Sequence, residues 1–202
     1  MLLPPMRYKA TNQETIAYFE AIAQSTSLPI MIYNNPIDYK IQVTLDMFEE
    51  LQCYQNIKAV KESTRDTTNI TRMRNRFGDR FQILCGVDTL AMESLVMGAD
   101  GWVAGLVDAY PEETVALYAY CKTQQYDKAR NLFLWFLPLL ELDISPPLVQ
   151  NLNLCEVATG LGTGYVRLPR NPLAGKEKER VQTIIDIAMS NRPTISDYKN
   201  IL

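Results

Sequence analysis

The chain has 202 residues and a formal charge of −3, with 47% apolar and 21% charged residues. This composition is typical of a globular protein with one good core, although a complete (β/α)8 barrel usually needs ~250 residues. The small negative charge creates no field that would attract nucleic acid or an anionic membrane surface. We therefore expect neither nucleic acid nor a membrane as a partner.

Histidine is absent, and the four cysteines form no CxxC pair. These absences exclude Ser-His-Asp and Cys-His nucleophile pairs and remove the usual zinc ligands, so we predict no metal. The mostly apolar neighbours of the cysteines indicate reduced, buried thiols in a cytoplasmic protein. The N-terminus lacks the pattern of a signal peptide, and the longest apolar stretch, 132–140, is too short to span a bilayer.

Helical and strand-like patterns alternate along the first half of the chain. Amphipathic patterns predict helices over 12–24, from 44 to about 53, and after the capping residues Asp66 and Asp88, with Asn12 as the first N-cap. Glycines at 78 and 98 are suited to close the third and fourth of these helices. Short apolar runs predict strands over 28–33, 57–61, 81–85 and 101–106. From residue 111 onward the pattern is helical, with a break at 143–147 and a loop over 160–175.

Strands that alternate with helices through short connections predict parallel βαβ units, either in a barrel or in an open doubly wound sheet. The phosphate-binding patterns GxGxxG and GxxxxGK[ST] of open sheets are not found. A glycine-rich segment at 160–164 follows a helix rather than a strand, so we interpret it as a loop. Only four full strands can be counted, with residues 1–3 as a candidate tail of another.

Tyr33 and Lys61 stand at the carboxyl ends of two predicted strands, the edge where parallel α/β proteins place catalytic groups. Burial disfavours the charged form of an amine, so a lysine here can supply a neutral nucleophile for a ketone. The alternative is that Lys61 pairs with Glu62 or Asp88 at a solvated rim. Tyr33 is either a proton relay, since a phenol both donates and accepts, or an aromatic anchor.

Taken together, four ordered motifs resemble the dihydrodipicolinate synthase / N-acetylneuraminate lyase family. The motifs are YNNP at 33–36, IKAVKES at 57–63, LCGVD at 84–88 and GADG at 98–101. The resemblance implies the carboxyl-terminal part of a (β/α)8 barrel, from the end of the fourth strand to the eighth, over residues 1–112. It implies the last barrel helix and a helical extension over 113–202.

By this resemblance Lys61 forms an imine with a small α-keto acid or cyclic imino acid, without a separate cofactor, and Tyr33 relays protons. Substrate binding is then expected from four residues: Gly86, Asp88, Val103 and Arg7. The resemblance also implies a homo-oligomer, since family members are commonly tetramers. Runs at 4–9, 101–110 and 135–140 are similar to members that act as 1-pyrroline-4-hydroxy-2-carboxylate deaminases in hydroxyproline catabolism. The alternatives are a dihydrodipicolinate synthase-like aldolase and a sugar keto-acid dehydratase.

The family's first three strands and most of the fourth have no counterpart in this sequence. The loop that holds the substrate carboxylate in the family belongs to that part, and Arg7 is a candidate to replace it as a bidentate donor. Two interpretations stay open: an imine-forming lyase whose other strands come from elsewhere, and an inactive truncated fragment. A half-barrel exposes unpaired strand edges, which favours association with other chains.

Overall fold

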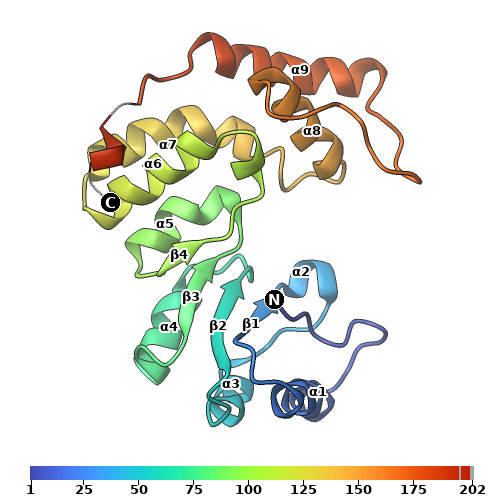
Figure 1. Ribbon diagram of the computed structural model, residues 1–202, viewed down its shortest axis with the longest axis vertical. Helices are drawn as coiled ribbons and strands as arrows, with labels where there is room; N and C mark the ends of the chain where they lie inside the picture. Colours follow the sequence, from blue (N-terminus) through green and yellow to red (C-terminus); the bar gives the residue numbers. More distant parts are fainter. Residues whose placement is uncertain (196, 201–202) are drawn as a thin grey trace. The chain divides into compact units, whose positions relative to one another are not determined.

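The computed structural model describes residues 1–195 and 197–200, and the chain forms two compact units, Met1–Val103 and Ala104–Leu202. Each unit has its own core. The first unit is an α/β structure and the second is helical (Figure 1). The predicted functional division at residue 112 is a different kind of boundary and stays a prediction.

The first unit is built on a four-stranded parallel sheet in the order β1-β2-β3-β4. Its strands are β1 Ile30–Asn34, β2 Ile57–Glu62, β3 Gln82–Cys85 and β4 Gly101–Trp102. Its helices are α1 Asn12–Ser25, α2 Pro36–Tyr39, α3 Leu45–Leu51, α4 Thr68–Phe77 and α5 Ala91–Val96, with the 3-10 turn η1 Asp88–Leu90 before α5. The predicted parallel βαβ organisation is confirmed, and Leu2 adds one parallel bridge to Ile32 beside β1.

The core of this unit lies between the sheet and its helices. Ile32, Val60 and Ile83, one from each of the first three strands, are almost completely buried. Phe48 of α3 packs edge-on against Phe81, with ring centroids 5.4 Å apart. The helices therefore cover the strand face that carries these aliphatic side chains. On the alternate positions of the same strands the side chains are only half-buried, as at Leu84.

Several predicted details of the first unit are wrong. The N-cap of α1 is Thr11, in a capping box with Glu14, rather than Asn12. The fourth strand has two residues instead of the predicted 101–106, because an apolar run alone does not distinguish a strand from a buried turn. Asp88 is not an N-cap residue: Val87 occupies the N-cap position of η1 and Leu90 that of α5. Cys53 is exposed, unlike the other three free cysteines.

The described residues of the second unit form four longer helices and two short turns. They are η2 Leu106–Asp108, α6 Pro111–Lys122, α7 Tyr126–Leu140, α8 Leu148–Thr159, α9 Gly175–Ser190 and η3 Tyr198–Asn200. The break before α8 and the loop before α9 lie where the sequence predicts them. Tyr110 and Phe136 are fully buried, and Trp135 stacks on Phe136. No helix among the residues that the structure describes is long and apolar enough to cross a membrane.

Candidate active site

The parallel register brings the two predicted catalytic residues together. Tyr33 of β1 is the register partner of Lys61 of β2, so both side chains leave the same face of the sheet at its carboxyl edge. Both are half-buried, and the Lys61 Nζ lies 4.5 Å from the centroid of the Tyr33 ring. The sheet therefore holds an amine above a phenol ring at the edge where parallel folds carry chemistry.

The short helix α2 holds the tyrosine from the other side. Asn35, its N-cap, donates through Nδ2 to the Tyr33 Oη over 3.2 Å. Tyr39, at the end of the same helix, packs edge-on against the Tyr33 ring, with centroids 5.4 Å apart. Burial raises the pKa of the Tyr39 phenol. The YNNP segment thus ends β1, begins α2 and orients the Tyr33 side chain.

Neither carboxylate that the sequence offered as a partner for the lysine takes that role. Glu62 points to the opposite, helix-facing side of the sheet, where it contacts Asn69 of α4. Asp88 is buried and accepts a hydrogen bond of 3.0 Å from the Trp102 indole. Over the described part of the chain, Lys61 forms no ion pair. Its amine contacts the Tyr33 ring and remains available to a ligand at this edge.

On the helix-facing side, Glu62 belongs to a buried polar network. Its Oε2 accepts from the Nδ2 atoms of Asn34 (3.3 Å) and Asn69 (3.0 Å), and its Oε1 accepts from the Thr64 backbone (2.9 Å). Asn34 also exchanges two hydrogen bonds with the Val43 backbone, which fixes the orientation of its amide. Burial raises the pKa of Glu62, and these donors oppose the shift. This network ties the ends of β1 and β2 to α4 directly behind the Tyr33–Lys61 pair.

Gly86, a predicted substrate-binding residue, lies against the lysine. A Cβ at this position would stand 2.2 Å from the Ser63 Oγ and 2.6 and 2.7 Å from the Lys61 Cγ and Cε. Only a residue without a side chain lets the end of β3 come this close. Its amide donates to the Glu62 carbonyl over 2.9 Å, which extends the β2–β3 ladder.

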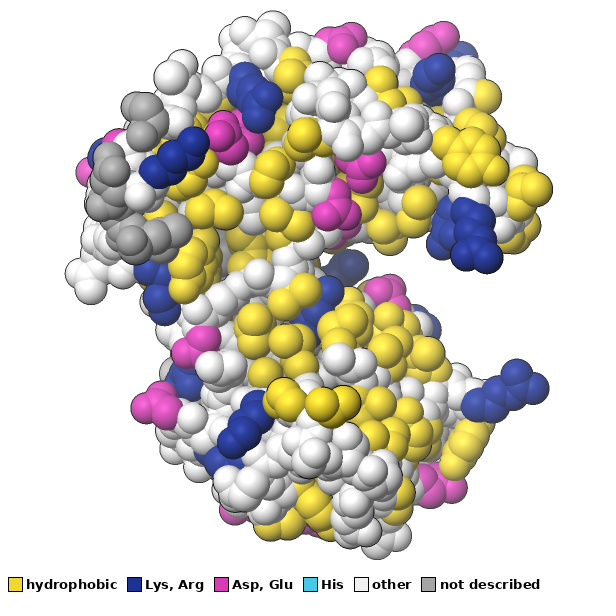
Figure 2. Space-filling view, viewed as in Figure 1, with side chains coloured by type: hydrophobic (Ala, Val, Ile, Leu, Met, Phe, Trp, Pro, Cys, Tyr) yellow, Lys and Arg dark blue, Asp and Glu magenta, His cyan; other side chains and the backbone are white. Residues whose placement is uncertain are grey.

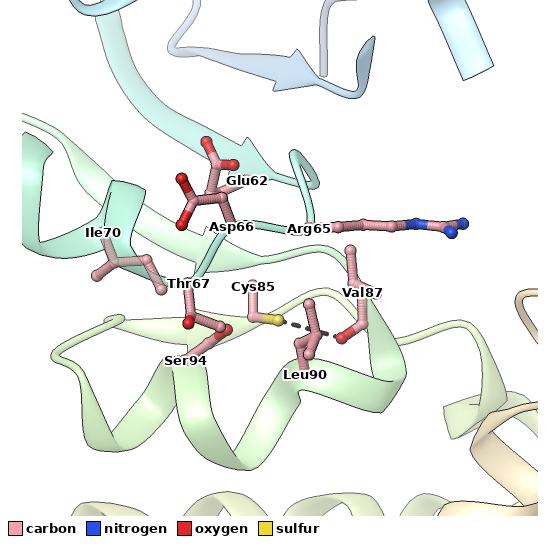
Figure 3. Close-up of a pocket in the computed structure, with 9 residues that line it drawn as sticks. All are labelled: Glu62, Arg65, Asp66, Thr67, Ile70, Cys85, Val87, Leu90 and Ser94. Carbon is pink, nitrogen blue, oxygen red and sulfur yellow. Dashed lines mark hydrogen bonds between the residues drawn. The ribbon is translucent and has the colours of Figure 1, made fainter. Parts of the chain in front are cut away.

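A small pocket lies on the other side of these strands (Figure 3). It is lined by Glu62, Arg65, Asp66, Thr67, Ile70, Cys85, Val87, Leu90 and Ser94. The Cys85 Sγ donates to the Val87 carbonyl over 3.3 Å, and burial raises the pKa of this thiol to about 11. Glu62 and Cys85 are register partners on the helix-facing side, so this pocket does not open onto the lysine.

The remaining predicted site residues lie in different settings. Val103 follows β4 and donates through its amide to the Cys85 carbonyl over 2.9 Å, and it is half-buried. Arg7 lies exposed in the turn before α1, beside a surface groove that Tyr18 also lines. Its role toward a substrate carboxylate stays a prediction. Within residues 1–195 and 197–200, no cluster of three or more His, Cys, Asp or Glu side chains could hold a metal ion.

Neither Ser63 nor the buried network was predicted from the sequence. Ser63 stands two residues after Lys61, and strand alternation alone places the two on one face. The network had no comparable signal, because Asn34, Glu62 and Asn69 come from three separate elements.

The model of the dihydrodipicolinate synthetase family matches residues 1–188. The chain belongs to this family. Members of this family are aldolase-type lyases. The chain is similar to the 4-hydroxy-tetrahydrodipicolinate synthase of Exiguobacterium sibiricum, with 30% identity over 84% of the chain and 58% of the relative. The synthase of Bartonella bacilliformis is 30% identical over 94% of the chain and 64% of the relative. The chain thus spans about three fifths of these synthases.

Solved structures of the family show the same fold. The 4-hydroxy-tetrahydrodipicolinate synthase of Methylacidiphilum fumariolicum superposes with a TM-score of 0.86 and 27% identity, covering 94% of this chain and 63% of that one. A sialic acid aldolase of Ruminococcus gnavus has a TM-score of 0.83 at 22% identity, covering 99% and 65%. The predicted fold class, part of a (β/α)8 barrel, is confirmed.

Proposed function

We propose that this chain carries the imine-forming site of a lyase that acts on a small α-keto acid or cyclic imino acid, with Lys61 as the nucleophile. The observation that carries the proposal is the register pair at the carboxyl edge, where the Lys61 Nζ stands 4.5 Å from the Tyr33 ring. The absence of an ion pair to Lys61 among the described residues supports the same role. Membership of a family of lyases is further support.

The chemistry follows from an amine beside a phenol. The neutral Nζ of Lys61 adds to the keto carbon, and the carbonyl oxygen takes a proton to give a carbinolamine. That hydroxyl leaves as water while the carbon–nitrogen double bond forms, and the protonated imine then withdraws electrons from the adjacent carbon. Tyr33 is the proposed proton relay, since its phenol can accept a proton from nitrogen and give one to the departing oxygen.

Two substrate classes fit this chemistry: keto acids and the cyclic imino acid. The runs that resemble hydroxyproline-catabolism deaminases include 135–140, yet Trp135 there donates to the Ala188 carbonyl over 2.9 Å and Phe136 is fully buried. Trp135 and Phe136 therefore contribute to packing within the second unit, and this run lends no direct support to a deaminase. The named relatives are synthases. We therefore propose keto-acid chemistry at Lys61 as the function, with deamination of the cyclic imino acid as the second candidate.

Borohydride trapping tests the proposal on the full chain. Pyruvate or 1-pyrroline-4-hydroxy-2-carboxylate is added with borohydride, which reduces an imine to a stable secondary amine, and the intact mass is measured. We expect a substrate-dependent mass increase in the wild type, none in Lys61→Ala, and at least about tenfold slower trapping in Tyr33→Phe. Lys58→Ala, an exposed lysine on the same strand, is the matched control.

Two results would defeat the proposal: a folded wild-type protein that forms no adduct, or a Lys61→Ala variant that still forms one. Ammonia release with the pyrroline carboxylate, compared with pyruvate as substrate, separates deamination from other keto-acid chemistry.

A further inference from the structure

Asn35 is a buried amide that joins Tyr33 to Asp38. It is only 6% exposed, and it caps α2 through its Oδ1, which accepts from the Asp38 backbone amide over 3.2 Å. Its Nδ2 donates to the Asp38 Oδ2 over 2.7 Å and to the Tyr33 Oη over 3.2 Å. A helix cap needs only the oxygen of this side chain, so the contact of its nitrogen with the phenol is an addition to the capping role.

Asp38 determines which end of the Asn35 amide faces the tyrosine. A carboxylate only accepts hydrogen bonds, and a backbone N–H only donates them. The opposite orientation of the amide would set its oxygen against the Asp38 carboxylate and its NH2 group against the Asp38 backbone N–H. The chemistry of Asp38 therefore requires that Tyr33 meets a donor and not an acceptor.

This donor decides where the proton of the phenol points. A phenol oxygen that accepts from Asn35 must direct its own hydrogen elsewhere. Within residues 1–195 and 197–200, no acceptor takes a hydrogen bond from the Tyr33 hydroxyl. The Lys61 Nζ lies 4.5 Å from the centroid of the same ring. The phenolic hydrogen is thus available to an oxygen on a molecule attached to the lysine.

We infer that Asn35 is a positioning residue, which acts through the Tyr33 oxygen and keeps the phenol ready to donate its proton. This inference rests on the proposed function. When Tyr33 gives its proton to the carbinolamine hydroxyl, the carbon–oxygen bond breaks, water leaves, and the nitrogen lone pair forms the double bond of the protonated imine. The negative charge that remains on the Tyr33 oxygen is stabilised by the N–H group of Asn35, which already points at it.

Asn35→Ser separates this role from helix capping. Serine caps a helix as well as asparagine does, but its shorter side chain has no amide to reach the Tyr33 oxygen. Full-length variants are trapped with pyruvate and excess borohydride, so that imine formation limits the rate. We expect the maximal trapping rate to fall roughly fivefold, the effect of losing one hydrogen bond of ordinary strength. The pyruvate concentration for half-maximal trapping should stay the same, because Asn35 does not contact the substrate.

A double-mutant cycle tests whether Asn35 acts through the phenol. In the Tyr33→Phe background there is no oxygen for Asn35 to hold, so Asn35→Ser should cause no further loss of rate. A second fivefold loss in that background overturns the inference, and so does a wild-type rate in the single variant Asn35→Ser.

Thr44→Ala is the control for stability. The Thr44 side chain caps α3 by accepting from the Met47 amide over 3.3 Å, so its loss should lower the melting temperature and leave trapping unchanged. A loss of trapping that Thr44→Ala shares would assign the effect of Asn35→Ser to stability and overturn the inference. An adduct at Lys61 that forms at the wild-type rate in Tyr33→Phe overturns the inference but leaves the nucleophile standing. A folded wild type without any adduct removes the proposed function as well.

Discussion

The two faces of the sheet in the first unit differ in how they treat polar groups. On the helix-facing side, Asn34 and Glu62 are buried, and each is held by several hydrogen bonds. On the other side, Lys61 and Ser63 lie within a few ångströms of one another, and the described residues offer them neither an ion pair nor a hydrogen bond to their side chains. In Figure 2 apolar side chains gather at the surface over the region of β1 and β2. One strand, β2, therefore contributes a hydrogen-bonded network through one face and the proposed reactive groups through the other.

This difference between the two faces accounts for the position of the polar network on the helix-facing side. A reactive edge needs a fixed lysine, but a lysine that was fixed by its own ion pair would be a poor nucleophile. The network behind β2 fixes the strand ends instead, through Asn34 and Glu62, and leaves the amine without a carboxylate partner. Substitutions on the helix-facing side should thus reduce stability, whereas substitutions on the lysine side should reduce chemistry.

The largest loss of stability is expected from Asn34→Ala. This change leaves the Val43 amide and carbonyl without their buried partner and removes a donor from Glu62. We expect the free energy of unfolding to fall by about 3 kcal/mol or more, as measured by denaturant unfolding. The adjacent change Tyr33→Phe, on the lysine side, should alter it by less than about 1 kcal/mol. Similar losses for the two variants would contradict the division between the faces.

Gly86→Ala should affect both stability and chemistry. The added Cβ overlaps the side chains of Lys61 and Ser63, and the strain should reduce the free energy of unfolding by about 1–3 kcal/mol. Displacement of the lysine should also lower the rate of borohydride trapping. Gly101→Ala is the control on the next strand, where a Cβ would meet only Leu84, at 3.4 Å from its Cδ2. A wild-type trapping rate in Gly86→Ala would show that the close approach is not required.

Glu62→Gln should reduce the free energy of unfolding by about 1–3 kcal/mol. In either orientation the new NH2 group faces another donor, because Asn34 and Asn69 donate to one carboxylate oxygen and the Thr64 amide donates to the other. Burial raises the folded-state pKa of Glu62, so its contribution to stability is complete below the unfolded pKa and is lost as the pH rises through the folded value. The stability difference between wild type and variant should therefore be greater near pH 4 than near pH 8. Urea unfolding of both proteins across this range measures it, and a constant difference would argue against a raised pKa.

The smallest expected effect is a difference in thiol labelling, which reports directly on which cysteines are buried. Cys53 is exposed, while burial raises the pKa of Cys85 to about 11 and that of Cys155 to about 12. We expect a maleimide to modify one thiol per native chain, at Cys53, and four after unfolding, as counted by mass spectrometry. Fast labelling of Cys85 in the native protein would show that the helix-facing pocket is open.

The parallel sheet and the pairing of Tyr33 with Lys61 could be predicted from the sequence because both depend on local signals. Short apolar strands alternate with helices, and strand ends meet at one edge in any parallel sheet. The fate of Glu62 could not be predicted in the same way. Its neighbour Lys61 is adjacent in sequence, yet strand alternation sends the two side chains to opposite faces, and the partners of Glu62 lie in β1 and α4.

Other structural details also could not be predicted from the sequence, again for physical reasons. Asp88 has the sequence position of a helix cap, but a buried indole donor from Trp102 competes for its carboxylate. The run after Gly101 is apolar enough for a strand, although the chain turns into η2 after two strand residues. Ser63 was within reach of the alternation rule, but its lack of a partner became visible only in three dimensions.

The central claim is that Lys61, and no other lysine, forms the imine. Peptide mapping after borohydride trapping with pyruvate tests it most directly, because a modified lysine resists trypsin and carries the added mass. We predict that the adduct is confined to the peptide that contains Lys61 and is absent at the exposed Lys58 of the same strand. An adduct spread over exposed lysines including Lys58, or no adduct at Lys61 in the folded protein, would contradict the account.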